Sequence, residues 1–221
     1  MSGLIRYVLD LLYPPRCMLC SRFVESSDET VCRRCIDVLP EYDGALRSVP
    51  YFEKTVAPFF YEEPIRGAVL RFKFYGMRTY AGQFATWMAV WVRDKLEGKY
   101  DLISWVPCSR RRRWSRGFDQ AELLAKALAE ELGVEAVATL KKIKHNPKQS
   151  QIGSADRRRA NVLGVYRAIN PKLWIGKRIL LVDDVLTTGA TLSECGKVLR
   201  MAGSGDLVCA VIAATRLEVK E

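Results

Sequence analysis

A small group of chemically capable residues lies near the end of the chain: two carboxylates, three threonines and a glycine. In chain order they are Asp183, Asp184, Thr187, Thr188, Gly189 and Thr191. Backbone N–H groups at the start of a helix bind phosphate, and threonine hydroxyls add further donors. Two acids beside a phosphate would repel it unless they face another group, and ribose hydroxyls fit that place, directly or through Mg²⁺. The pattern therefore predicts a site for a sugar phosphate.

This group needs a strand before it and a helix after it, and the sequence supplies both. Residues 178–182 (RILLV) predict a buried strand that ends at the two acids, and residues 188–201 predict a helix. Ligands of open α/β sheets bind beyond the carboxyl ends of the strands, and Gly189 allows the backbone to approach a phosphate closely. The segment is not a P-loop, because no lysine follows the glycine.

The rest of the chain alternates strand and helix patterns. Continuous apolar runs at residues 102–106 and 207–214 predict further buried strands, which favours a parallel sheet covered on both faces. Residues 55–61 predict an edge strand, because a proline within them lacks the N–H donor. We also expect helices at residues 3–12, 64–74, 79–96 and 118–132, weaker strands at 135–139 and 162–168, and a linker at 40–54.

The segment VDDVLTTGAT resembles the 5-phosphoribosyl-1-pyrophosphate (PRPP) loop of type I phosphoribosyltransferases. Over nearly its whole length the chain resembles the ComF family (ComFC and GntX-like proteins). The features that carry this resemblance are the paired CxxC motifs near the N-terminus, VPCSRRRRWSRGFDQAELLA, residues 149–159 and ILLVDDVLTTGATL. The resemblance implies a type I phosphoribosyltransferase-like α/β fold, with a parallel sheet flanked by helices, and a protein that binds PRPP with Mg²⁺.

The resemblance also implies roles for particular residues. The catalytic pair, which would hold the ribose hydroxyls, is Asp183 and Asp184. The residues implied around the 5′-phosphate are Val185, Thr187, Thr188, Gly189, Ala190 and Thr191. Arginine offers bidentate donors to a diphosphate, and the pyrophosphate is expected after the first core strand, in a loop with Pro107, Cys108, Arg110 and Arg111. Family members commonly carry Asn where this chain has Asp119. Alternatively, the arginines form a solvated face, or a nucleic-acid patch on which Trp114 stacks bases.

Residues 141–159 resemble the hood loop that closes over PRPP and excludes water from an activated sugar. Gln149, Arg157 and Asn161 fit the family's pattern in this stretch. The single histidine, His145, is interpreted as a solvated loop residue rather than a general acid or base.

Four cysteines form the pattern C-x₂-C-x₁₁-C-x₂-C, at Cys17, Cys20, Cys32 and Cys35. Two such pairs build a tetrahedral four-thiolate site, the closed geometry of structural zinc, and leave no open position for catalysis at the metal. The alternatives are an iron–sulfur cluster or a pair of disulfides. The remaining cysteines are expected to be small buried residues, with the first of them beside the pyrophosphate pocket: Cys108, Cys195 and Cys209.

These patterns predict two domains. Residues 1–45 would form an N-terminal helix and zinc-binding module, and residues 46–221 a phosphoribosyltransferase-like domain, with a hood or acceptor segment at 46–98 and a core at 99–221. The hood or acceptor segment is rich in aromatic residues, which we interpret as mostly core, with one or two that could stack a flat acceptor. They are Tyr51, Phe52, Phe59, Phe60, Tyr61, Phe72, Phe74 and Tyr75.

Composition limits the possible partners and location. The 221 residues are 49% hydrophobic and 27% charged, with a formal net charge of +10, which excludes a disordered or coiled-coil chain and favours anionic partners. No stretch approaches the roughly 20 apolar residues of a membrane span, and we find no signal-peptide pattern. We therefore expect a cytoplasmic protein without membrane insertion.

Two functions fit the sequence. The first is an enzyme that transfers ribosyl phosphate from PRPP to an unknown acceptor, with the role in natural competence and DNA uptake that the resemblance implies. The alternative is a non-catalytic competence factor that binds single-stranded DNA and keeps the PRPP site as a sensor or vestige. Residues 104–160 favour this alternative, with 13 basic against 6 acidic side chains. The expected partners are PRPP, single-stranded DNA and proteins of the competence machinery.

Overall fold

The continuous apolar runs form the centre of one parallel sheet in the computed structural model, which describes residues 14–26, 28–42, 48–143 and 164–216. Strand β6 (Ile179–Leu186) pairs with β7 (Leu207–Ala214) and with β3 (Leu102–Trp105), while β1 (Lys54–Val56) and β2 (Phe59–Phe60) both pair with β7 at one edge. A proline separates β1 from β2, as expected for a residue without an N–H donor. The predicted parallel α/β sheet is confirmed.

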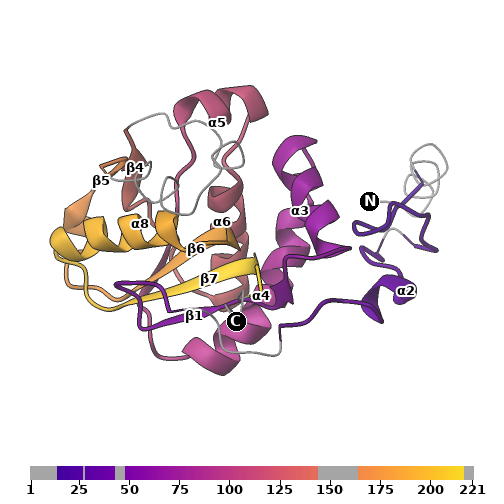
Figure 1. Cartoon of the computed structure of the whole chain (residues 1–221), viewed down its shortest axis with the longest axis horizontal. Coiled ribbons are helices and arrows are strands. Elements are labelled where there is room, and N and C mark those ends of the chain that lie inside the picture. Colours follow the sequence, from indigo (N-terminus) through magenta and orange to yellow (C-terminus); the bar gives the residue numbers. More distant parts are fainter. Residues whose placement is uncertain (1–13, 27, 43–47, 144–163, 217–221) are drawn as a thin grey trace, which may run out of the picture.

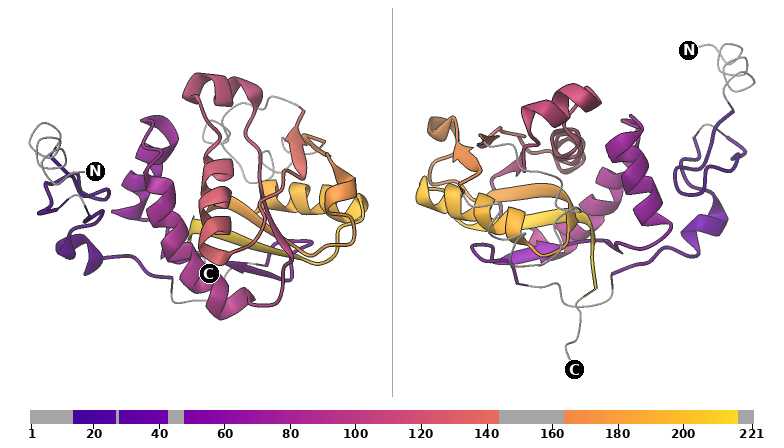
Figure 2. Two further views of the ribbon diagram at one scale, coloured as in Figure 1. Left: turned by 180° about the vertical axis from the view of Figure 1, so that it is seen from behind. Right: turned by 45° about the horizontal axis from the view of Figure 1, so that its top comes forward.

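Helices flank this sheet (Figures 1 and 2). Successive strand residues point to opposite faces, so the sheet has two hydrophobic cores. On one face, α4 (Tyr80–Leu96) and α6 (Gln120–Leu132) pack with Val182 and its neighbours. On the other face, α8 (Ala190–Met201) packs with Leu181 and its neighbours.

A further helix, α3 (Ile65–Phe74), stands between the N-terminal cysteine segment and the sheet with its helices (Figures 1 and 2). The cysteine segment contains the short helix α2 (Arg33–Ile36). Its residues Cys17 and Met18 are buried in the same hydrophobic core as α3 and α4. The segment is therefore packed onto the rest of the chain through this core.

The arginine-rich segment after β3 is a helix, α5 (Arg110–Arg116), and not the loop that the sequence predicted. Ser109 precedes it and its hydroxyl accepts a hydrogen bond from the Arg112 N–H at 3.4 Å. Gly117 ends it with a φ of 77°, a left-handed conformation that suits glycine. Arginine is a good helix former, so two capping residues are enough to close a short helix around this run.

The predicted strand at residues 135–139 is wrong. Within the described residues, their only ladder contact is the single parallel bridge of Ala136 with Ile103 at the sheet edge, where the Ile103 N–H donates to Glu135 and the Val137 N–H donates to Ile103. The extended pairing begins one residue later, where β4 (Leu140–Lys142) pairs antiparallel with β5 (Tyr166–Ala168). The latter confirms the strand expected within residues 162–168. A 3₁₀ turn, η2 (Pro171–Leu173), leads from β5 toward β6.

Residues 40–54 are partly core, not simply a linker. Tyr42, Val49 and Phe52 are buried on the face of the sheet that α8 covers. Helix α8 comes so close that a Cβ at Gly196 would lie 2.7 Å from the Phe52 ring. Buried apolar side chains therefore hold the described residues of this segment against the sheet.

Short irregular segments cover both edges of the sheet. Glu41 forms an antiparallel bridge with Phe59, and the Phe60 N–H donates to the carbonyl of Pro40 at 2.7 Å. At the opposite edge, Ala136 forms a parallel bridge with β3.

No helix in the described part of the chain is long and apolar enough to cross a bilayer. The helix expected at residues 3–12 lies outside the described residues, as do the hood-loop residues His145, Gln149, Arg157 and Asn161.

Candidate functional site

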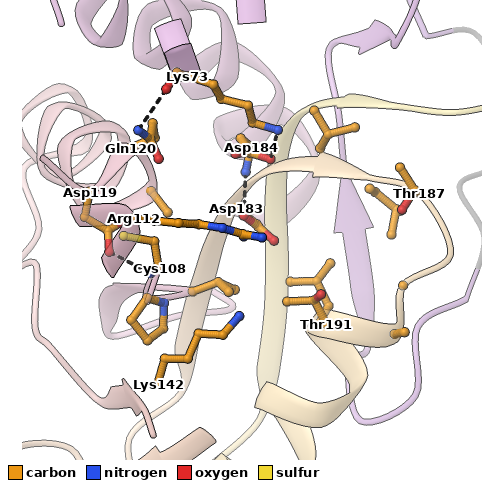
Figure 3. Close-up of a pocket in the computed structure, with 18 of the residues that line it drawn as sticks. Lys73, Cys108, Arg112, Asp119, Gln120, Lys142, Asp183, Asp184, Thr187 and Thr191 are labelled. Atoms are coloured by element: carbon orange, nitrogen blue, oxygen red, sulfur yellow. Dashed lines mark hydrogen bonds and ion pairs between the residues drawn. The ribbon is translucent and has the colours of Figure 1, made fainter. Parts of the chain in front are cut away.

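A cleft of about 500 Å³ opens at the carboxyl ends of β3 and β6, between α3, α5 and the start of α8 (Figure 3). Most of the expected ligand residues line it: Pro107, Cys108, Asp183, Asp184, Val185, Thr187, Thr188, Gly189, Ala190 and Thr191. Arg110 and Arg111 do not. The cleft is also lined by Tyr61 and Phe74, two of the aromatic residues considered for stacking an acceptor. The sequence analysis missed further lining residues, which include Leu70, Lys73, Arg112, Arg116, Gln120, Lys142 and Tyr166.

The two acids lie within β6 and not beyond its end, because the strand continues to Leu186. Residue 183 still pairs with β7, opposite Val211. This pairing fixes the backbone beneath both carboxylates. The Asp184 N–H donates to Oδ1 of Asp183 at 2.8 Å (Figure 3). Burial, and then the neighbouring charge of Asp184, raise the pKa of Asp183. The Asp183 carboxyl therefore ionises at a higher pH than an ordinary aspartate, and a cation or hydrogen-bond donor beside it would favour its ionised form.

The threonine segment forms the start of α8. Gly189 precedes the helix with a φ of 76°, and a Cβ at this position would lie 3.4 Å from Val49. Glycine is therefore favoured by conformation, while the space around it would admit a small side chain. The Ala190 N–H is 3.4 Å from the Thr188 hydroxyl oxygen, which accepts its hydrogen bond. The residues of this first turn and the threonines beside it line the cleft, and a helix start with nearby hydroxyls is an arrangement suited to a phosphate.

Basic side chains line the opposite wall. Arg112 and Arg116 come from α5 and Lys142 from β4. Residues four apart share one face of a helix, so the helical form of α5 turns these two arginines inward and leaves Arg110 and Arg111 exposed. The i, i+4 spacing is a sequence signal that the loop interpretation overlooked. The pKa of Lys142 is lowered by burial and then by the charge of Arg112.

Asp119 supports this wall from inside the protein. Its Oδ2 accepts the Cys108 N–H at 2.7 Å, and its Oδ1 accepts the Glu122 N–H at 3.5 Å, so it both fixes the segment after β3 and caps α6. Its side chain is buried, which raises its pKa. Burial and then the charge of Asp119 raise the pKa of Cys108 to about 12, so this thiol stays protonated at neutral pH. Cys195 and Cys209 are buried, as predicted.

Helix α3 supplies the third wall. Lys73 points into the cleft, and its Nζ lies 2.8 Å from Oδ1 of Asp184 (Figure 3). Leu70 and Phe74 lie beside it along the same stripe of the helix, at spacings of three and one, and also line the cleft. The contact between Lys73 and Asp184 joins elements far apart in the sequence, so no local pattern indicated it.

The four N-terminal cysteines come together as predicted. All four Sγ atoms lie within 4.8 Å of one another, and those of Cys20 and Cys32 are 3.7 Å apart. Four thiolates at zinc–sulfur distances of about 2.3 Å would be about 3.8 Å apart, so the residues fit a tetrahedral zinc ion. The N–H groups of Leu19 and Cys32 each donate to Cys17 Sγ at 3.4 Å. Burial opposes ionisation of Cys17, but these and other hydrogen bonds outweigh it and lower its pKa to about 7.

Two parts of the chain match known domain families, and several curated proteins are similar to it. Residues 119–221 match the phosphoribosyl transferase domain, and residues 8–46 match the double zinc ribbon domain. The chain is 30% identical over 196 residues to Competence protein F of Haemophilus influenzae, which covers 85% of both chains. It is 31% identical over 153 residues to Competence protein ComFC of Streptococcus pneumoniae, with 68% of this chain and 64% of that protein covered. DNA utilization protein YhgH of Escherichia coli K12 is 27% identical, with 85% of both chains covered.

Similar solved structures share less of the sequence. Adenine phosphoribosyltransferase from Thermoanaerobacter pseudethanolicus is 23% identical with a TM-score of 0.37, and covers 75% of this chain and 81% of its own. Glutamine PRPP amidotransferase from B. subtilis is 18% identical with a TM-score of 0.45, and covers 65% of this chain and 30% of its own.

The chain thus carries a phosphoribosyltransferase-type domain behind a zinc ribbon. It belongs to the ComF family, as its sequence motifs predicted. The zinc ribbon match and the four-cysteine geometry together support structural zinc.

Proposed function

We propose that the cleft binds PRPP together with Mg²⁺. The observation that carries this proposal is that two walls of the cleft differ in chemistry, with the acid pair and the start of α8 in one and Arg112, Arg116 and Lys142 in the other. A sugar that carries a monophosphate and a diphosphate needs both kinds of surface. Carboxylate oxygens suit a hard cation, and Mg²⁺ bound with PRPP would neutralise part of the pyrophosphate charge.

Each wall then has a role. Asp183 and Asp184 accept the ribose hydroxyls, directly or through the cation, and residues 187–191 hold the 5′-phosphate. The guanidinium groups of Arg112 and Arg116 and the ammonium of Lys142 face the pyrophosphate, in the place that the sequence analysis gave to Arg110 and Arg111. Pro107 and Cys108, in the segment after β3, also line the cleft.

In the transfer reaction, the ribosyl phosphate of bound PRPP passes from pyrophosphate to the acceptor, and the exchange takes place at its anomeric carbon, C1. The bond from C1 to the pyrophosphate oxygen breaks, its electron pair leaves with pyrophosphate, and a nucleophile of the acceptor bonds to C1 and loses its proton. The apolar wall of Tyr61, Leu70 and Phe74 borders the acid pair and is where we place the acceptor. Of the eight aromatic residues considered for stacking a flat acceptor, only Tyr61 and Phe74 line this cleft and stay candidates.

Calorimetric titration tests the binding proposal. The zinc-loaded protein is titrated with PRPP in the presence of Mg²⁺, beside the double variant Asp183→Asn/Asp184→Asn and the control Asp206→Asn, whose exposed acid pairs with Arg200 away from the cleft. We expect micromolar binding by the natural chain and the control, and a loss of at least about a hundredfold in the double variant. Absence of binding by the natural chain, or equal binding by all three proteins, would refute the proposal.

The names of the relatives suggest the cellular process in which this chain takes part, the uptake or use of DNA. Two are named competence proteins and a third a DNA utilization protein. We extend this to the present chain as a role in the uptake or use of DNA in the cytoplasm, beside other proteins of the competence machinery. A deletion strain that keeps normal growth but loses transformation, and recovers it with the natural chain, is the expected result. Unchanged transformation would contradict this role.

Single-stranded DNA binding is a second candidate function, and one observation favours it. Trp114 on α5 is 90% exposed and has the exposed Arg110, Arg111 and Arg113 around it. Aromatic rings with flanking cations stack bases and bind phosphates without sequence preference. We expect the affinity for an oligonucleotide to fall steeply with salt and to fall about tenfold in Trp114→Ala, while the control Met201→Ala, exposed on α8, binds normally. Insensitivity to both salt and the Trp114 change would exclude this function.

A further inference from the structure

Helix α3 connects the cysteine module to the cleft through two side chains that lie two residues apart. Such residues point to nearly opposite sides of a helix, because each position turns the helix by about 100°. Arg71 points to the cysteine module and Lys73 points into the cleft. The position of α3 between these two parts is visible in both views of Figure 2.

Arg71 is bound to the metal-binding turn itself. Its Nη2 donates to the carbonyls of Met18 at 2.8 Å and Leu19 at 2.6 Å, the two residues enclosed by the first cysteine pair. Its Nε atom is buried. An arginine in this place costs desolvation and keeps its favourable contacts only while both carbonyls remain turned toward it.

The orientation of these carbonyls depends on the cysteine cluster. The Leu19 N–H bonds to Cys17 Sγ, and Cys20 supplies the next sulfur, so the backbone that carries both carbonyls is held at each end by a metal-binding residue. Zinc fixes such turns, which have little structure of their own without it. The site for Arg71 is therefore complete only when the cluster is closed.

The other side of α3 is held at the cleft. The Lys73 carbonyl accepts a hydrogen bond from Gln120 Nε2 at 3.4 Å, and Gln120 Oε1 accepts one from Arg116 at 2.6 Å. The last turn of α3 is thus attached to Arg116 of α5 through Gln120, and to Asp184 of the acid pair through Lys73. A shift of this turn would move Lys73 relative to Asp184.

We infer that Arg71 is a positioning residue through which the metal centre sets the place of Lys73, and so sets the affinity of the cleft for its ligand. The ligand part of this inference rests on the proposed PRPP function. Coupling between two sites is reciprocal, so zinc strengthens PRPP binding and PRPP strengthens zinc binding by the same factor. The four-cysteine module then has a part in ligand binding as well as in stability.

A double-mutant cycle with PRPP and Mg²⁺ tests the connection. Arg71→Lys keeps the charge but cannot reach both carbonyls as the arginine does, and we expect its PRPP affinity to fall about fivefold. In the Lys73→Met background, the same change should have almost no further effect. The matched control is Arg66→Lys, on the same helix, because Arg66 is exposed and pairs with Glu63. Additive losses in the double variant, or equal losses in the control, would overturn the inference.

Hydrogen exchange tests the connection without any ligand. We expect zinc removal by a chelator to speed exchange of the amides at residues 71–75 in the natural chain, while amides of β7 stay protected as evidence of an intact sheet. In Arg71→Lys the same amides should exchange fast already with zinc bound. If zinc removal leaves the exchange of these amides unchanged in the natural chain, the coupling is refuted. If exchange depends on zinc but the chain does not bind PRPP, only the proposed ligand is refuted. Competition with a chromophoric chelator measures the reciprocal effect of PRPP on zinc release.

Discussion

The Nζ of Lys73 lies 2.8 Å from Oδ1 of Asp184, and each of the two side chains keeps only 19% of its surface exposed. The acid pair therefore has a cation of its own before any ligand arrives. Removal of one partner from a partly buried pair is costly, because it leaves the other charge without its counter-ion. Lys73 thus reduces the repulsion that two adjacent carboxylates would otherwise exert on a phosphate.

Removal of Lys73 should change the pH dependence of PRPP binding. Burial, and then the Asp184 charge, raise the pKa of Asp183, while the Lys73 charge lowers it. Asp183 must ionise to accept ribose hydroxyls, so affinity should rise with pH. In Lys73→Met the midpoint should move upward by about one pH unit. Titration calorimetry at a series of pH values measures this midpoint. The control is Lys95→Met, because Lys95 is exposed and pairs with Asp94. Coincident pH profiles of the two variants would contradict the prediction.

Asp183→Asn should stabilise the protein while it weakens binding. The folded state raises the pKa of this carboxyl, so over the window between the unfolded and folded pKa values the native chain holds a proton that the unfolded chain has lost. The aspartate therefore lowers stability as pH rises through that window, and asparagine does not. We expect the melting temperature advantage of the variant to widen by about 3 °C between about pH 5 and about pH 8. A constant difference would show that folding does not shift this pKa, and a narrowing one that the shift has the opposite sign; either would contradict the prediction.

The two faces of α5 should behave differently toward pyrophosphate. Arg112 lines the cleft and Arg110 is exposed outside it. Charge-assisted hydrogen bonds to arginine are among the strong ones, so Arg112→Ala should weaken pyrophosphate binding by about tenfold or more, and Arg110→Ala by less than about twofold. Titration calorimetry with Mg²⁺ and pyrophosphate gives both values. Equal losses would mean that α5 acts only as a diffuse positive charge.

Asp119 should contribute to stability through two backbone donors. Asp119→Ala leaves the Cys108 N–H without its acceptor and removes the cap of α6, which should cost about 2 kcal/mol and lower the melting temperature by about 4–8 °C. Asp119→Asn keeps one acceptor oxygen and should lose about half as much. Thermal unfolding measures both; an alanine variant as stable as the natural chain would show that neither hydrogen bond matters.

The sequence analysis predicted the central sheet and the loop before α8, because both depend on local patterns. Continuous apolar runs identify strands buried on both faces, and β7 has the predicted bounds. The acids, threonines and glycine follow one another in the chain, so their proximity needed no knowledge of the fold. The helix at residues 79–96 was recognisable by its periodicity and begins one residue later than expected.

The other two walls of the cleft depend on features that local patterns do not reveal. Helix α5 has no apolar stripe, so only the spacing of its arginines and its capping residues, Ser109 and Gly117, marked it as a helix. Lys73 and Lys142 come from elements that meet the acids only after the chain has folded. The types and spacing of residues in the sequence therefore identified the wall that holds the acid pair and the start of α8. The other two walls follow from the packing of distant elements.

The antiparallel bridge between Glu41 and Phe59, with the hydrogen bond from Phe60 to Pro40, also protects the protein from association. An uncovered edge strand offers its backbone to another chain and seeds aggregation. Here the segment that leads out of the metal-binding module occupies that edge. A cut before residue 48 would remove more than the zinc ribbon, since it would leave β2 open to strand exchange with a second molecule.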